Sequence, residues 1–257
     1  MCHLKVVENG RQMFPTKLPI ISQPSTAFSN TYSLGLDGSD DYVNIGDVSD
    51  LDFGTSAFSV SFWAKTTHDG YQALFGKQDT SSGWYLYYYH TYDRIDFYHR
   101  KDVRYTYGAD SSFPNDGAWR HCLFTRNGAT GTIYINGVDI TNTGTSQNIS
   151  GDVDSSGDDC EIGRRLLGST DDRYVNGNID EVAIWDEVLD ADAATAVYNS
   201  GVPFDLTANK GNYDNSNDLV GYWRFEEGSG TSVADSSDNS NTGTLVNTPT
   251  WSADVPS

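Results

Sequence analysis

Short runs of alternating apolar and polar residues cover most of the chain, and turn residues separate them. The clearest run is AFSVSFWAK at 57–65. Because successive side chains of a strand point to opposite sides, one face of it carries Phe58, Val60, Phe62 and Ala64. Asn136-Gly137, between apolar pairs, is a strong hairpin signal. Further strands are expected within 32–46, 73–77, 83–90, 94–100, 119–128, 131–140, 160–168 and 176–189. This spacing predicts an all-β sandwich or jelly roll.

One helix interrupts this pattern. In LDADAATAVYNSG (189–201), Asp190 is placed to cap the first turn, the body is rich in alanine, and Gly201 follows the last turn. Residues 206–218 then read as a polar linker, and 219–251 bring further strand and turn segments. Residues 1–30 contain three prolines and no amphipathic period. They are expected to form an extended arm, either disordered or laid against a partner.

The charge balance narrows the possible partners. The chain has 36 acidic and 16 basic residues and a net charge of −20, so it should repel nucleic acid and anionic membranes. Six of the acids are glutamates, which leaves 30 aspartates, and aspartate favours turns. The charge therefore serves solubility, or clustered aspartates bind Ca²⁺, which prefers oxygen ligands.

The cysteines and the apolar runs exclude further classes. The three cysteines are an odd number without a CxxC pair, which argues against a disulfide framework and against zinc. The N-terminus lacks an apolar run of signal-peptide length, and no stretch approaches the roughly 20 apolar residues of a membrane span. We therefore expect synthesis without a secretion signal, and no membrane insertion.

Seven motifs in a fixed order carry a family resemblance. They are LGLDGSDDYVNIG, FSVSFWAK, GWYLYY, DGAWRHCLFTRNG, TIYINGVDI, IGRR and GNIDEVAIWDEVLDADAATAVYNSG. From about residue 32 to 201 the chain resembles the LamG-like jelly-roll family of the concanavalin A-like lectin/glucanase superfamily. The resemblance implies an all-β, two-sheet antiparallel jelly-roll sandwich with one short helix near the C-terminal end of the domain.

The C-terminal part departs from the family order. Residues 219–251 look like the segment that usually precedes the LDGSDDYV strand, yet here they follow the domain. They either complete the same sandwich, as in a circular permutation, or reach a neighbouring subunit or begin a truncated second copy. We divide the chain into an arm (1–30), a LamG-like domain (31–205) and a linker with a C-terminal strand segment (206–257) that completes the sandwich.

The resemblance also implies a structural Ca²⁺ that joins the early Gly/Asp turn to an aspartate on a late strand. The matching positions are Asp37, Gly38 and Asp180, with Asp180 expected at a strand edge. The alternative is that both aspartates cap turns without a metal. Two weaker candidates are GDVDSSGDD (151–159), which imitates the start of an EF-hand loop, and DSSDNSN (235–241).

No catalytic constellation is visible. Retaining glucanases of the superfamily carry an ExDxE or ExDxxE strand, with two carboxylates about 5–5.5 Å apart, and the six glutamates form no such pattern. No G-x-S-x-G elbow occurs, and the five histidines show no metal spacing. His99 and His121 are expected to be packed or hydrogen-bonded. The sequence therefore predicts a protein that is not an enzyme.

Residues 84–89 (WYLYYY) place rings on both faces of a strand. Trp84, Leu86 and Tyr88 match the inward positions of the family. The outward row and its expected neighbours on the next strand form the candidate ligand or interface site: Tyr85, Tyr87, Tyr89, Asp96, Tyr98 and Arg100. These tyrosines either stabilise the sheet under a loop or the arm, bind another protein, or stack on a sugar.

Three functions fit these observations. The leading prediction is a non-catalytic structural or attachment protein on a virion surface, as a capsid decoration or a fibre or tail component, because the layout resembles LamG-type proteins of tailed marine phages. Its partners would be virion proteins, copies of itself or host-surface glycans. The alternative is a free, Ca²⁺-dependent, extracellular glycan-binding module of a microbe. A glycoside hydrolase is the third and least favoured.

Overall fold

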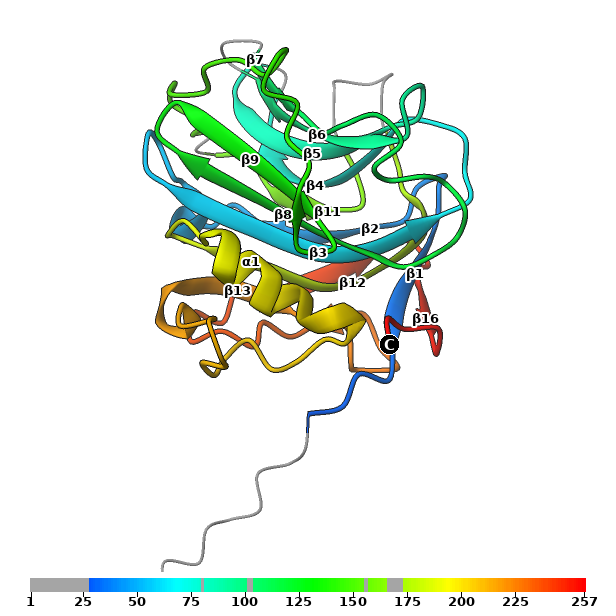
Figure 1. Cartoon of the computed structure of the whole chain (residues 1–257). Helices are drawn as coiled ribbons and strands as arrows, with labels where there is room; N and C mark the ends of the chain where they lie inside the picture. The colour runs from blue at the N-terminus through cyan, green and yellow to red at the C-terminus, as the bar shows by residue number, and fades with distance from the viewer. Residues whose placement is uncertain (1–27, 80, 101–103, 155–156, 166–172) are drawn as a thin grey trace, which may run out of the picture.

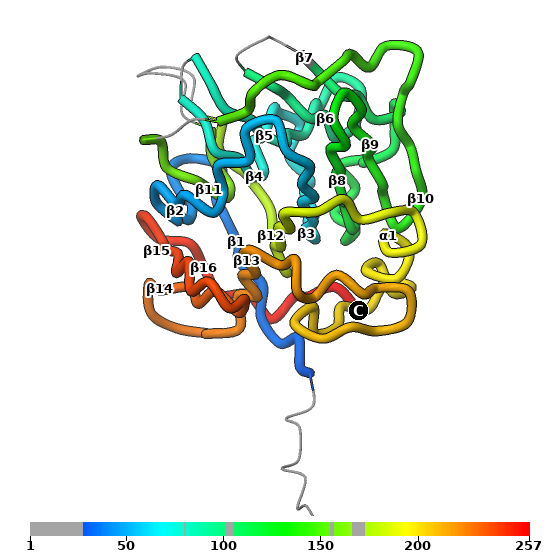
Figure 2. The backbone as a smooth tube through the Cα atoms, turned by 90° about the vertical axis from the view of Figure 1, so that its left-hand side faces the viewer, coloured from blue at the N-terminus to red at the C-terminus, as the bar shows by residue number. Residues whose placement is uncertain are grey.

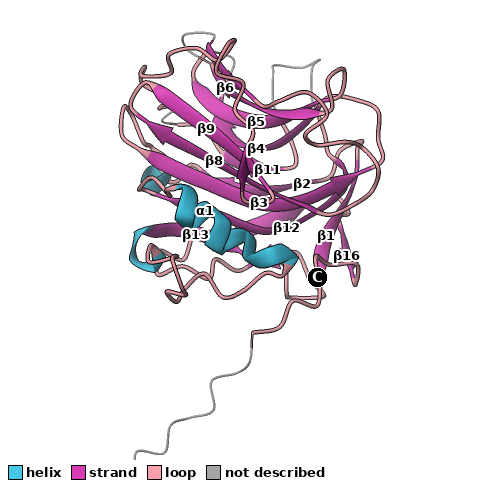
Figure 3. Cartoon of the chain, in the orientation of Figure 1, coloured by secondary structure: helices cyan, strands magenta, loops and turns pink. Residues whose placement is uncertain are grey.

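The computed structural model describes residues 28–79, 81–100, 104–154, 157–165 and 173–257. Within these residues the chain forms two antiparallel sheets of eight strands each, stacked as a sandwich (Figure 1). Strands dominate, and the short helix α1 lies on the outer side of one sheet (Figure 3). The expected all-β, two-sheet jelly-roll sandwich with one short helix is confirmed.

The two sheets are called A and B here. Sheet A contains, in spatial order, β10 (Val138–Asp139), β9 (Thr130–Ile135), β8 (Arg120–Asn127), β3 (Phe58–Thr66), β12 (Asn176–Trp185), β1 (Ser33–Asp37) and β16 (Thr250–Ser252), and β13 (Leu219–Trp223) also pairs with β12. Sheet B contains β14 (Ser232–Val233), β15 (Gly243–Val246), β2 (Tyr42–Gly46), β11 (Cys160–Ile162), β4 (Gln72–Gln78), β5 (Gly83–Tyr89), β6 (Arg94–His99) and β7 (Arg104–Tyr107). The helices are α1 (Ala191–Tyr198) and the 3-10 turns Ser49–Leu51, Asn199–Gly201 and Ser216–Asp218.

The core between the sheets follows the alternation in the sequence. The inward rows of β3 and β5 both belong to it, namely Phe58, Val60, Phe62 and Ala64, and Trp84, Leu86 and Tyr88. Phe97 of β6 and Phe124 of β8 join the two sheets, because their rings stack with centroids 4.0 Å apart. The hairpin turn at Asn136-Gly137 has positive φ at both residues, as its sequence predicts.

Helix α1 covers the outer face of sheet A. The Asp190 side chain accepts a hydrogen bond from the Ala193 amide at 2.8 Å and so caps the first turn, as expected. Asn199, in the left-handed conformation, ends the helix. A second apolar cluster lies beneath the helix and the segment that follows it, and it contains Leu123, Tyr134, Ala183, Trp185, Leu189, Ala193, Ala194, Val197, Phe204, Leu206, Tyr213, Leu219 and Tyr222.

The C-terminal strands lie within both sheets of the same sandwich. β13 pairs with β12, β16 with β1, and β15 with β2. Figure 2 shows these orange and red strands beside the blue strands β1 and β2. The Trp223 side chain is fully buried in the core. Residues 219–252 thus supply strands to the sandwich, while the limits of the three segments proposed from the sequence stay a prediction.

Two further findings concern the cysteines and membrane-spanning helices. Cys122 and Cys160 are buried free thiols, and burial raises the pKa of both. Among the described residues, the structure has no helix both long and apolar enough to cross a bilayer. Most of the predicted arm, residues 1–27, lies outside the described residues.

Replacing Trp223 with alanine tests the contribution of the C-terminal strands to the core. We expect Trp223→Ala to lower the free energy of unfolding by about 3–5 kcal/mol, because it empties a large buried volume. Trp119→Ala is the matched control, since Trp119 is only half-buried, and it should cost clearly less. Urea denaturation followed by circular dichroism measures both, with Trp223→Phe as the milder variant if the alanine variant does not fold. Equal losses at the two positions would contradict the placement of Trp223.

Candidate functional site

A band of tyrosines covers the outer face of sheet B. Sheet B lies on the side of the molecule opposite α1 (Figure 1). It is called the tyrosine face and comprises Tyr71, Tyr85, Tyr87, Tyr89, Tyr92, Tyr98, Tyr105 and Tyr107. β5, β6 and β7 position most of these rings. Because their inward residues fill the core, the alternate positions must face outward. The structure thus places the predicted row Tyr85, Tyr87 and Tyr89 on this face.

The centre of the tyrosine face is packed rather than open. Tyr85 and Tyr98 are only 4% and 5% exposed, and Tyr87 is 8% exposed. Tyr85 lies opposite Tyr98, and Tyr98 opposite Tyr105, with ring centroids 4.8 and 4.5 Å apart. Arg165 donates from Nη1 to the Tyr85 hydroxyl at 2.7 Å. Burial raises the pKa of Tyr85 to about 12. These rings therefore form a neutral cross-strand cluster that stabilises the sheet.

Asp96 is buried within this face and holds Arg94 in place. It lies between Tyr87 and Tyr107 in register and has no exposed surface. The Arg94 Nε approaches its Oδ1 at 2.9 Å, and the Gly108 amide donates to the same oxygen at 3.2 Å. Burial raises the pKa of Asp96 to about 6, although the Arg94 charge opposes that shift. Asp96 is thus on the predicted face, but it anchors Arg94 instead of meeting solvent.

The accessible part of the tyrosine face lies at its edge, where the β5–β6 turn and β7 meet the segment after β10. A hollow of about 510 Å³ opens there, and it is lined by Tyr92, Arg94, Tyr107, Asp110, Asn142 and Thr145. We call it the Arg94 hollow. Its volume lies within the range of roughly 300–1,000 Å³ that is usual for ligand sites. Of the predicted residues, Tyr89 borders it by stacking on Tyr92 at 5.2 Å, whereas Arg100 lies elsewhere, 6.0 Å from the Tyr98 ring centroid.

Arg94 organises the hollow. Its guanidinium carbon lies 4.5 Å from the Tyr92 ring centroid and 4.8 Å from that of Tyr107. Its Nη1 donates to Asp110 Oδ1 at 2.7 Å. Tyr92 is 44% exposed, although Tyr89 stacks on its ring and Arg94 lies over it, so part of this aromatic side chain borders the hollow beside a carboxylate and an amide. An exposed aromatic ring with nearby polar groups suits stacking on a ligand that also needs hydrogen bonds.

A second polar network lies on sheet A, where β12 changes partners. β1 pairs with Asn176–Ile179 and β13 with Val182–Trp185, so Asp180 and Glu181 lie between the two partner strands. The register with β3 shifts at the same place, and Glu181 has a φ of +48°. This is a β-bulge. β12 is an interior strand of sheet A, so the expectation that Asp180 lies at a strand edge is wrong.

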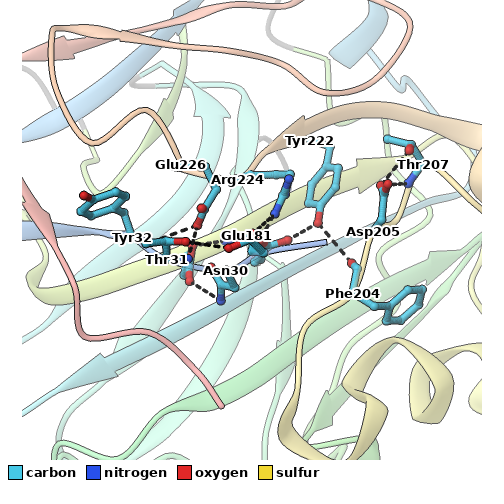
Figure 4. A network of polar contacts seen from close by, with 12 residues as sticks. Asn30, Thr31, Tyr32, Glu181, Phe204, Asp205, Thr207, Tyr222, Arg224 and Glu226 are labelled. Atoms are coloured by element: carbon cyan, nitrogen blue, oxygen red, sulfur yellow. Dashed lines mark hydrogen bonds and ion pairs between the residues drawn. The ribbon is translucent and has the colours of Figure 1, made fainter. Parts of the chain in front are cut away.

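Both acids of this junction are buried and hydrogen-bonded. Figure 4 shows Glu181 between Tyr222 and Arg224. Asn30 donates from Nδ2 to Asp180 Oδ2 at 3.1 Å, and the Tyr222 hydroxyl donates to Glu181 Oε2. The Arg224 Nε lies 3.4 Å from Glu181 Oε1, and its Nη2 donates to a backbone carbonyl of the arm, that of residue 29, at 2.6 Å. Burial, with the adjacent Glu181 carboxylate, raises the pKa of Asp180, and burial raises the pKa of Glu181 to about 7.

A serine and a histidine lie close to this junction. The Ser61 Oγ is 3.2 Å from His121 Nε2, and both residues are buried beside Glu181. Their shared cavity holds about 10 Å³, which is the space of one water molecule. Burial lowers the pKa of His121 to about 3. His121 is packed and hydrogen-bonded as expected.

Comparisons with known proteins support the family suggested by the motifs. The family model described as "Concanavalin A-like lectin/glucanases superfamily" matches residues 37–194, which is more than half of the chain. The chain belongs to this superfamily. No curated protein sequence matches it.

Two solved structures share the fold of this superfamily member. The first is a "putative carbohydrate binding protein" from Bacteroides ovatus, with 16% identity and a TM-score of 0.66. The alignment covers 89% of the present chain and 62% of that one, so the present chain spans less than two thirds of its length. The second is a heptameric SAP-like pentraxin from Limulus polyphemus, with 16% identity, a TM-score of 0.51, and coverage of 66% and 82%. At this identity the likeness concerns the fold alone.

The structure does not assemble the calcium set implied by the superfamily resemblance. Asp37 lies opposite Asn176, and Asp180 is four residues farther along β12, which is roughly 13 Å at 3.3 Å per residue. Asp37 instead lies near Asp40 and Asp41, with carboxylate oxygens within 4.8 Å of one another. Three carboxylates fit the oxygen chemistry of Ca²⁺, and they would be the residues that hold it. The set of Asp37, Gly38 and Asp180 is therefore wrong, while calcium at the first turn stays a prediction.

The two weaker metal motifs have structural roles in the described residues. Asp154 accepts a hydrogen bond from the Gly54 amide, and Asp235 accepts from the amides of Tyr222 and Asn241, each at 2.8 Å. Beside the 151–159 loop, the buried Lys77 ammonium already supplies a cation to neighbouring aspartates. Ser156 of the first motif lies outside the described residues.

The sequence interpretation missed the residues that line the Arg94 hollow. Tyr92 lies in the turn after the aromatic strand, Arg94 begins β6, and Tyr107 belongs to RYTYG, an alternating run from which no strand was predicted. That alternation was an available signal. No local signal indicated the contribution of Asn142. Its backbone amide donates to the Tyr107 carbonyl at 2.8 Å, across 35 residues of sequence.

The buried acids of the junction predict a pH dependence of stability. Because the pKa values of Asp180 and Glu181 are raised in the folded chain, it binds more protons than the unfolded chain between about pH 4 and pH 7. The free energy of unfolding should therefore fall as pH rises through this window. Asp96 contributes in the same direction up to about pH 6.

Glu181→Gln should flatten this decline, because it removes one titrating carboxyl. Glu187→Gln is the control, since Glu187 is exposed and its substitution should retain the wild-type slope. Urea unfolding at pH 5, 6, 7 and 8 gives the slopes. A wild-type slope in Glu181→Gln would contradict the assignment.

The revised calcium geometry predicts a second contrast. Ca²⁺ should raise the melting temperature, Asp37→Asn should remove that rise, and Asp180→Asn should retain it, because Asp180 lies roughly 13 Å away along the strand. Thermal melts with Ca²⁺ and with EDTA measure the response. A rise that Asp180→Asn abolishes as well as Asp37→Asn would argue for the ligand set implied by the resemblance, and no rise in the wild type would remove calcium from the description.

Proposed function

We propose that this protein is a non-catalytic carbohydrate-binding module that holds glycans in the Arg94 hollow. The observation that carries the proposal is the combination of a partly exposed ring with hydrogen-bonding groups around one opening, namely Tyr92 with Asp110, Asn142 and Thr145. Sugars have apolar faces of C–H groups and edges of hydroxyls, so they match such a surface. The superfamily and the name of the Bacteroides ovatus protein support this ligand class.

The side chains of the hollow are preorganised. Arg94 is fixed by Asp96 and Asp110, and Tyr92 and Tyr107 pack against its guanidinium. A site whose groups are already held loses less conformational freedom on binding, which favours affinity. The centre of the tyrosine face supports the hollow from one side but offers little accessible surface of its own.

A non-catalytic role is consistent with the placement of the buried groups. Asp180, Glu181, Ser61 and His121 lie on sheet A, on the side of the sandwich opposite the hollow. Asp110 in the hollow pairs with Arg94, and Asp96 behind it has no exposed surface. Glycoside hydrolysis needs two carboxyl groups that flank the scissile bond, one of them protonated. The hollow offers one exposed carboxylate, so binding is the chemistry it supports.

The broader setting that we propose is attachment at a virion surface, or otherwise in an extracellular location. The described chain begins at residue 28 on the side of sheet A, away from the tyrosine face (Figure 1). Glu226 Oε1 accepts hydrogen bonds from the backbone amides of Thr31 and Tyr32 at 2.7 and 3.1 Å, and Asn30 donates to Asp180. These bonds hold the segment before β1 on the sandwich. A module tethered through its N-terminus would then present the Arg94 hollow outward. Virion proteins, or copies of the chain, would be the partners at the tethered end.

Glycan binding is tested by removing the exposed ring. We expect Tyr92→Ala to weaken binding about tenfold, because losing a stacked ring removes roughly 1.5 kcal/mol. Tyr32→Ala is the control, since Tyr32 is half-buried beside the arm entry on the other side of the sandwich, and it should bind like the wild type. A glycan array identifies the ligand and calorimetry measures its Kd. Wild-type affinity in Tyr92→Ala would place the glycan elsewhere, and an array without hits would reject the function.

A further inference from the structure

The positive charge of Arg94 in the hollow is already neutralised by the protein's own carboxylates. Its Nε faces Asp96 at 2.9 Å and its Nη1 faces Asp110 at 2.7 Å, while rings cover its flat surfaces. The Arg94 side chain is only 11% exposed. An arginine that reads an anionic sugar presents its planar fork of donors to the carboxylate or sulfate. Here that fork is turned toward the protein's own carboxylates.

The charge of the hollow is negative. One guanidinium and two carboxylates give a sum of −1, since Asp96 is largely ionised above its pKa of about 6. The Asp110 side chain is 59% exposed and lies at the opening. The chain as a whole has a net charge of −20, so an anionic ligand meets repulsion both locally and at long range.

The groups that remain available suit hydroxyls. The Asp110 carboxylate accepts hydrogen bonds, the Asn142 amide both donates and accepts, and so does the Thr145 hydroxyl. A pyranose with neighbouring hydroxyls can donate two hydrogen bonds to one carboxylate while its C–H face lies on the Tyr92 ring. None of these contacts requires a charged group on the sugar.

We infer that the Arg94 hollow selects neutral, hydroxyl-rich glycans and rejects sialylated, sulfated or uronic-acid glycans, with Asp110 as the residue that sets this preference. The inference rests on the proposed function and specifies its ligand class. Asp110 acts in two ways, as a hydrogen-bond acceptor for sugar hydroxyls and as the charge that cancels Arg94.

The test compares matched glycans. An array carries each neutral oligosaccharide beside its sialylated, sulfated or uronic-acid counterpart and is probed with the wild type, Asp110→Asn and Asp192→Asn at pH 7. Asp192 is an exposed residue at the start of α1, so Asp192→Asn makes the same change in net charge far from the hollow. Thermal melts of the three proteins confirm that each is folded.

We expect the wild type to bind neutral glycans at least tenfold more tightly than their acidic counterparts. Asp110→Asn should lose affinity for the neutral glycans and reduce that ratio at least threefold, while Asp192→Asn keeps both values. Wild-type binding to acidic glycans that equals or exceeds binding to neutral ones would overturn the inference and leave the proposed function intact. An equal change of ratio in Asp192→Asn would overturn the role of Asp110, and binding to no glycan would overturn the proposed function itself.

Discussion

The bulge at Asp180 and Glu181 is the constraint on which the sandwich depends. β12 must present Ile179 to the core beside β1, and Val182 and Ile184 beside β13. Strict alternation from Ile179 would turn Val182 and Ile184 outward. One extra residue corrects the phase, at the cost of burying two carboxyls where β1 and β13 meet end to end. Asn30, Tyr222 and Arg224 supply the donors that make this burial tolerable, so the segment before β1 and the region of β13 are tied to one strand.

This arrangement gives the two outer faces of the sandwich different roles. The outer face of sheet A is closed by α1 and by the segment that leads to β13, which bury the second apolar cluster. The outer face of sheet B has no helix among the described residues, and it carries aromatic rings with polar hydroxyl groups instead. Tyrosine suits that position because its ring packs on neighbouring strands while its hydroxyl tolerates water. The proposed glycan site therefore lies at the face that the helix leaves uncovered.

The alternation of apolar and polar residues and the turn residues made the fold predictable. The register between distant strands made the candidate site difficult to predict. The inward rows of β3 and β5, the hairpin at Asn136-Gly137 and the Asp190 cap all depend on neighbours within a few residues. The pairing of Asp37 with Asn176 depends on how two distant strands align, and the bulge alters that alignment. Sequence identified the outward tyrosines, but which of them stay accessible depends on packing by Arg165 and Tyr105.

The Arg94 hollow lies at an edge strand of sheet B. β7 is the last strand of sheet B, and an uncovered edge invites pairing with other chains. The segment after β10 follows this edge, because the amides of Asn142 and Gln147 donate to the carbonyls of Tyr107 and Tyr105 at 2.8 and 2.9 Å. The same segment closes one wall of the hollow with Asn142 and Thr145. The segment after β10 therefore both covers the edge strand and forms one wall of the hollow. The sheet fixes the aromatic rings, whereas substitutions in the covering segment would change the wall of the hollow without disturbing the core.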